Sequence, residues 1–124
     1  MAQTVERAIA QAKFYSDGIN YAFVQLPPTA ITAAAAVIAE IAEPFCALIV
    51  DKDEVSLMIP ENALAEFGRR LPGYVKGSAH YRLITIDVVL EPDLVGFMAR
   101  ISAALAAAGI TLMPFAAFAR DHLL

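Results

Sequence analysis

The chain has 124 residues, of which 59% are hydrophobic and 18% charged, and its formal net charge is −4. This length suits one ordinary domain or two very small ones, and the apolar fraction is high enough to bury a core. The basic residues are scattered, with Arg69-Arg70 as their only adjacent pair, so we expect no nucleic-acid partner.

The sequence predicts neither a targeting signal nor a disulfide or reactive cysteine. The N-terminus is polar and helical rather than a basic segment followed by an apolar core, and no apolar run approaches the ~20 residues of a membrane span. We therefore expect a cytoplasmic protein without a membrane partner. The single cysteine, Cys46, excludes an intrachain disulfide, and its apolar surroundings favour a buried small hydrophobe over a reactive thiol.

The first half of the chain predicts alternating helices and strands. Residues 19–26 (INYAFVQL) are rich in β-branched and aromatic side chains, which is typical of a strand. Residues 45–50 (FCALIV) form a continuous apolar run that favours a buried strand, and the polar turn after it predicts a hairpin. The remaining predicted elements are a surface helix over 3–13, helices over 29–43 and 60–68, a return strand over 54–59 and a short strand over 74–76.

The second half predicts a strand over 82–90, a helix over 93–108, a strand over 110–118 and a short segment over 121–124. Apolar residues of the helix recur with a 3.6-residue period, at Leu94, Phe97, Met98, Ile101 and Leu105. Asp93 stands where an N-cap belongs, and Gly109 where the helix should end. Both halves place a proline after the first strand, then a helix and an apolar strand, which indicates a weak internal repeat.

Two motifs carry a family resemblance. Gly96, Ile101, Leu105, Gly109 and Ile110 follow the spacing G-x-x-x-x-I-x-x-x-L-x-x-x-G-I, and residues 53–61 read D-E-V-S-L-M-I-P-E. Together they resemble small bacterial tandem ACT proteins related to CASTOR-type amino-acid sensors, over roughly residues 14–124. The closing residues 120–124 (RDHLL) imitate the T-D-Y-I-L-V stretch of that group, but Arg and His replace Thr and Tyr, and alanines precede them.

The resemblance implies an α+β fold of ferredoxin-like βαββαβ units, two in tandem, with antiparallel sheets and helices on one face. The expected domains are an N-terminal helical extension (1–18), a first unit with its linker (19–80) and a second unit (81–124). The second unit lacks a final helix and strand after Leu124, so either the chain is shortened or a partner supplies them. An uncovered edge or face then predicts a homodimer.

The resemblance further implies an amino-acid ligand at the joint between units. Its carboxylate would bind backbone N–H groups around the start of the second helix, and its amino group would lie near Asp87 or Glu91. The predicted ligand-binding residues are Asp87, Glu91, Asp93, Leu94, Val95 and Gly96. Three alternatives stay open: Asp87 as a solvent-facing strand residue, Asp93 as a helix cap, and Gly96 as relief of crowding in the first turn.

The sequence thus predicts a non-enzymatic regulatory protein that binds a small molecule. The alternative is a ligand-free structural module that assembles through its sheets. No nucleophile motif, phosphate-binding loop or dinucleotide fingerprint is present. His80 and His122 are far apart and have no ligand spacing to Cys46, so we expect no catalytic residues, no metal and no cofactor.

Overall fold

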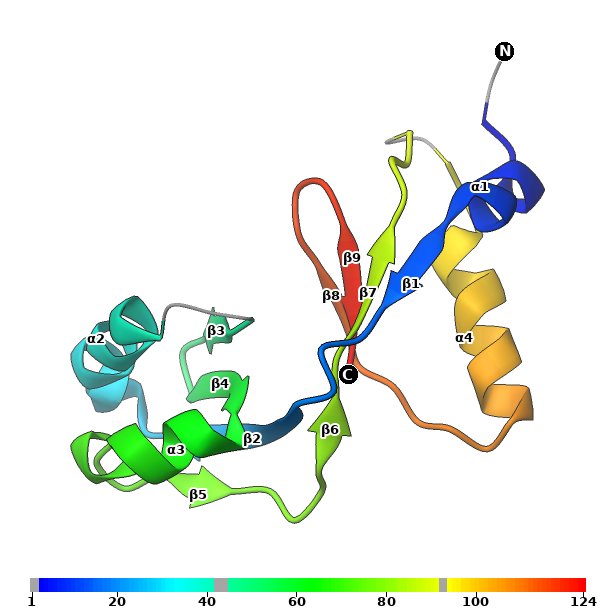
Figure 1. Cartoon of the computed structure of the whole chain (residues 1–124). Helices are drawn as coiled ribbons and strands as arrows, with labels where there is room; N and C mark the ends of the chain where they lie inside the picture. Colours follow the sequence, from blue (N-terminus) through cyan, green and yellow to red (C-terminus); the bar gives the residue numbers. More distant parts are fainter. Residues whose placement is uncertain (1–2, 42–44, 92–93) are drawn as a thin grey trace. The chain divides into compact units, whose positions relative to one another are not determined.

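The computed structural model describes residues 3–41, 45–91 and 94–124. It is an α+β structure with antiparallel sheets, and its contacts divide the chain into two compact units (Figure 1). Unit 1 is formed by Met1–Ser16 together with Leu83–Leu124, and unit 2 by Asp17–Arg82. The two ends of the chain therefore belong to the same unit.

Unit 2 follows the order expected for the first half of the chain. Its elements are β2 (Asn20–Leu26), the 3-10 turn η1 (Pro28–Ala30), α2 (Ile31–Glu40), β3 (Ala47–Val50), β4 (Val55–Pro60), α3 (Glu61–Phe67), η2 (Gly68–Arg70), β5 (Val75–Lys76) and β6 (Tyr81–Arg82). The strand order is β3-β4-β2-β5, with all pairs antiparallel, and β6 also pairs with β2. The predicted strands over 19–26, 45–50, 54–59 and 74–76 are confirmed within a few residues.

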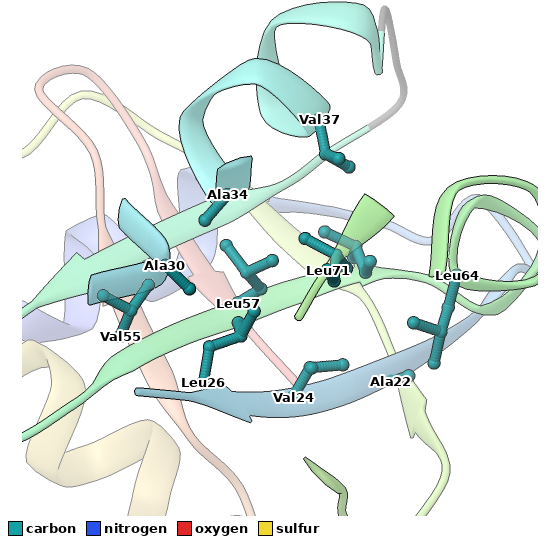
Figure 2. Packing of buried hydrophobic residues seen from close by; sticks show 11 residues of the cluster. Ala22, Val24, Leu26, Ala30, Ala34, Val37, Val55, Leu57, Leu64 and Leu71 are labelled. Carbon is teal, nitrogen blue, oxygen red and sulfur yellow. The ribbon is translucent and has the colours of Figure 1, made fainter. Parts of the chain in front are cut away.

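The core of unit 2 lies between the sheet and helices α2 and α3. Alternate residues of β2 point to this side, and Ala34 and Val37 of α2 and Leu64 of α3 pack against them (Figure 2). The strand members of the cluster are Ala22, Val24, Leu26, Val55, Leu57 and Ile59. Alanines in α2 keep that helix slim, so it lies close to the strands. Cys46 packs at the border of this cluster, and burial raises the pKa of its thiol.

Unit 1 contains the other sheet, which has four strands. Its elements are α1 (Val5–Gln11), β1 (Lys13–Tyr15), β7 (Ile84–Asp87), α4 (Phe97–Ala107), β8 (Pro114–Ala116) and β9 (Asp121–Leu123). The strand order is β1-β7-β9-β8, again with all pairs antiparallel. Strands β7 and β8 are shorter than the predicted strands over 82–90 and 110–118, and the segment 121–124 supplies a paired strand.

The N-terminal residues are not a separate extension, which corrects the predicted boundary at residue 18. Strand β1 pairs with β7, with Lys13 opposite Asp87. Ala8 of α1 is fully buried in one cluster with Ile86 and Phe97, and α1 contacts α4. The apolar side chains of α1 pack against residues of the C-terminal segment. Burial of this apolar surface stabilises the association of α1 and β1 with the rest of unit 1.

The two sheets can be compared by their strand orders. Strands β7, β8 and β9 of unit 1 follow the order that β2, β3 and β4 follow in unit 2, and β1 takes the place of β5 at the end of the sheet. Strand β1 pairs with β7 in unit 1, just as β5 pairs with β2 in unit 2. The two units therefore share one strand order despite different orders along the chain.

Candidate functional site

The residues predicted to bind a ligand run along the chain from Asp87, the last residue of β7, to Gly96, just before α4. Helix α4 begins at Phe97, with Gly96 as its N-cap, and not at Leu94 as the apolar period predicts. Gly96 adopts φ +95°, a left-handed conformation that interrupts the helix and that side chains other than glycine rarely adopt. Space is not the constraint, because a Cβ there would meet Val5 Cγ2 at an ordinary 3.8 Å.

The start of α4 has the chemistry of an anion site. Among the described residues no side chain caps it, and its first turn contains no acidic residue. The first N–H groups of a helix have no partners within the helix, and they carry the positive end of its dipole. Arg100 adds a cation one turn in, although its guanidinium lies 3.3 Å from Glu6. Asp93, the predicted cap, lies outside the described residues.

Asp87 is an exposed residue at the end of β7, as its strand position predicts. Its Oδ1 accepts a hydrogen bond from Arg120 Nε at 3.1 Å. Both side chains are about half exposed, so this ion pair contributes at most about 1 kcal/mol to stability. A ligand ammonium would therefore compete with Arg120 for a weakly held carboxylate.

Glu91 is tied to the N-terminal segment. Its two carboxylate oxygens each lie 3.2 Å from the backbone N of Gln3, and its own N–H donates to Gln3 Oε1 at 2.8 Å. The amide of Gln3 also donates to the carbonyl of Val89 at 2.8 Å. These exposed bonds join residues 86 or 88 positions apart in sequence, so they hold the segment after β7 against the residues before α1.

The other two predicted residues have different roles. Leu94 is half-buried and packs against the unit 1 cluster, and its N–H donates to the Glu91 carbonyl at 3.0 Å. Val95 is 86% exposed. Asp87, Glu91, Leu94, Val95 and Gly96 thus lie in one unit along one segment, but Asp87 and Glu91 both have internal partners. Gln3 and Arg120, which hold them, carry no signal in the sequence.

The end of α4 confirms the predicted stop at Gly109. Gly109 adopts φ +75°, Ile110 N donates to Leu105 O at 2.9 Å and Gly109 N to Ala106 O at 3.0 Å. This pair of bonds is a Schellman motif, which needs the left-handed residue that glycine supplies.

The described residues contain no group of three or more His, Cys, Asp or Glu side chains able to hold a metal ion. His122 Nδ1 lies 2.9 Å from Thr85 Oγ1, and partial burial lowers the pKa of this imidazole, with the Arg120 charge acting in the same direction and the Asp121 charge opposing it. In the part of the chain that is described, no helix is long and apolar enough to cross a membrane.

Comparisons with known proteins support the α+β class. No protein-family model and no curated protein matches the sequence. The chain is similar to the crystal structure of a Vibrio cholerae protein of unknown function, described as a possible transport protein, with a TM-score of 0.74 at 22% identity. The match covers 97% of this chain and 82% of that one. At this identity the likeness concerns the fold alone.

Proposed function

We propose that this chain is a regulatory protein of tandem ACT type, built from two ferredoxin-like units, that binds a small molecule. The strand orders support the fold part of the proposal. Unit 2 runs β-α-β-β-α-β with the order β3-β4-β2-β5, and the order of unit 1 is equivalent. An antiparallel sheet with helices on one face is what such units require.

The start of α4 is the observation that carries the binding proposal. A glycine-initiated helix of 11 residues follows a strand, and its first turn has no acidic side chain to occupy the N–H groups. An amino-acid ligand suits this arrangement: its carboxylate accepts from the first N–H groups of α4, and its ammonium pairs with Asp87. No covalent step is involved, so the proposed protein is not an enzyme and needs no cofactor.

Regulation follows if the ligand favours one arrangement of the protein. A ligand shifts an equilibrium only by the difference between its affinities for the two arrangements. The bonds of Gln3 to Val89 and Glu91 join the N-terminal segment to the residues just before the proposed site. Binding at the start of α4 can therefore change the position of α1 through these hydrogen bonds.

A panel of the twenty amino acids, tested by thermal unfolding of the full chain, is the first experiment. A true ligand present at 100 times its Kd is expected to stabilise the protein by about 2.7 kcal/mol. The measurement is the unfolding temperature with and without each amino acid at fixed protein concentration. No stabilisation by any member of the panel would remove the amino-acid proposal.

We also propose that the protein forms a homodimer through a sheet edge. Strand β3 lies at one end of the unit 2 sheet, and Ile49 and Val50 on it are 44% and 57% exposed. An edge of this kind presents unpaired backbone groups to a second strand. Light scattering after size exclusion is expected to give a dimer, and a monomer mass of 13.3 kDa would contradict this.

A ligand-free module that assembles through its sheets is the second candidate. The internal partners of Asp87 and Glu91 favour it, since both carboxylates are engaged without a ligand. In this case the start of α4 has only a structural role, and the amino-acid panel gives no stabilisation.

A further inference from the structure

Unit 2 has a hollow on the sheet face opposite α2 and α3. It has a volume of about 290 Å³, and its lining includes Phe23, Gln25, Glu54, Ser56, Val75 and Gly77. Gln25 of β2 lies between Ser56 of β4 and Val75 of β5 in the strand register. Neighbouring residues Val24 and Leu26 point to the helix side, so the hollow belongs to the other face of the sheet.

The hollow combines one carboxylate with an apolar wall. Among the described lining residues Glu54 has the only charged side chain, and Ser56 and Gln25 add a hydroxyl and an amide. Phe23 forms the apolar wall with Val75, and an edge-on contact with Tyr81, at 6.4 Å between ring centroids, supports its ring. In the part of the chain that the structure describes, no lysine, arginine or histidine contributes to the lining.

The hydrogen bonds that hold Glu54 in place are made by its backbone, so its carboxylate can pair with a ligand. Its N–H donates to Asp51 Oδ1 at 2.9 Å, and its carbonyl accepts from Asp51 N at 3.1 Å. Within the described ranges, the half-buried Glu54 carboxylate has no ion-pair partner. The adjacent Asp53, in contrast, is paired with Lys52 at 3.2 Å.

We propose that this hollow binds a small primary amine with an apolar body. The ammonium pairs with the Glu54 carboxylate and donates further to Ser56 Oγ or Gln25 Oε1, while the apolar part packs on Phe23 and Val75. A free amino acid is disfavoured, because its carboxylate would meet Glu54 without a compensating cation. A metal ion is disfavoured too, since one carboxylate supplies too few ligands. The site is independent of the one at α4.

The size of the hollow limits the ligand. Ligand pockets run from about 300 to 1,000 Å³, so a hollow of about 290 Å³ suits a compact amine. 2-Phenylethylamine is a suitable probe, with 2-phenylethanol and 3-phenylpropionate as neutral and anionic analogues of similar shape.

The test is a titration of the full chain, followed by amide chemical shifts. The amine is expected to shift the resonances of residues 23–25 and 54–56, to bind about two- to fivefold more tightly than the alcohol, and to bind where the carboxylate does not. Absence of shifts in these residues, or equal affinity for the amine and the alcohol, would overturn the proposal.

Two variants locate the charge that matters. Glu54→Gln keeps the shape of the side chain and both backbone bonds, and is expected to weaken amine binding about two- to fivefold. Asp53→Asn makes the same charge change at an exposed neighbour outside the lining, and is expected to leave the affinity unchanged. Equal weakening of amine binding by both variants would indicate a general charge effect and overturn the assignment. Unchanged unfolding temperatures establish that both variants are folded.

Discussion

Replacing Ala8 by aspartate is expected to destabilise unit 1, although most of that unit comes from residues 83–124 at the other end of the sequence. Ala8 is fully buried in one cluster with Ile86, Phe97 and Leu123. A carboxylate placed there has no partner, and it is expected to lower the free energy of unfolding by about 3 kcal/mol or more. Amide hydrogen exchange measures the effect separately in each unit.

The expected exchange pattern is specific. In Ala8→Asp, amides of β7 and β9 lose protection, while those of β2 and β4 in unit 2 keep it. Ala10→Asp makes the same change at an exposed position of the same helix, and is expected to lower the free energy of unfolding by less than about 1 kcal/mol. Unchanged protection of β7 in Ala8→Asp would contradict the placement of α1 in unit 1.

Replacing Ala99 by glutamate is expected to remove amino-acid binding without loss of stability. Ala99 is exposed and is the third residue of α4. A carboxylate in the first turn interacts favourably with the helix dipole, so the free energy of unfolding of the ligand-free protein should rise by about 0.3–1 kcal/mol. The same carboxylate occupies or repels the proposed position of the ligand carboxylate. The stabilisation by the amino acid is therefore expected to vanish.

Ala103→Glu is the matched control for this prediction. Ala103 is exposed on the same face of α4, one turn further from its start. The substitution adds the same charge and should leave ligand stabilisation intact. A full ligand response in Ala99→Glu would show that the start of α4 does not bind the carboxylate. An equal loss in both variants would indicate a general charge effect.

Much of the fold was predictable because local patterns determine it. The β-branched and aromatic side chains of residues 19–26 predicted β2, and the β3–β4 hairpin followed from an apolar run and a polar turn. Gly109 ended α4 as predicted, because a left-handed C-terminal residue is a local requirement. The start of α4 was misplaced, because the apolar period continues through Leu94, whereas the positive φ of Gly96 interrupts the helix.

The N-terminal pairing could not be predicted in the same way. Strand β1 has three residues, all exposed, so it shows no alternation between buried and exposed positions. Its partner β7 lies at the far end of the sequence, and such long-range pairing leaves no local periodicity. The partners of the candidate carboxylates, Gln3 and Arg120, were missed for the same reason: exposed polar contacts between distant segments have no sequence signature.

A single titration tests the central claim most directly, namely that the start of α4 holds a ligand carboxylate. The full chain, isotopically labelled, is titrated with the amino acid that stabilises it most, and every backbone amide is followed. The account predicts that the largest chemical-shift changes fall on Val95 to Arg100, with saturation at the Kd obtained from thermal unfolding. Largest changes in unit 2, or no changes at the start of α4, would contradict it.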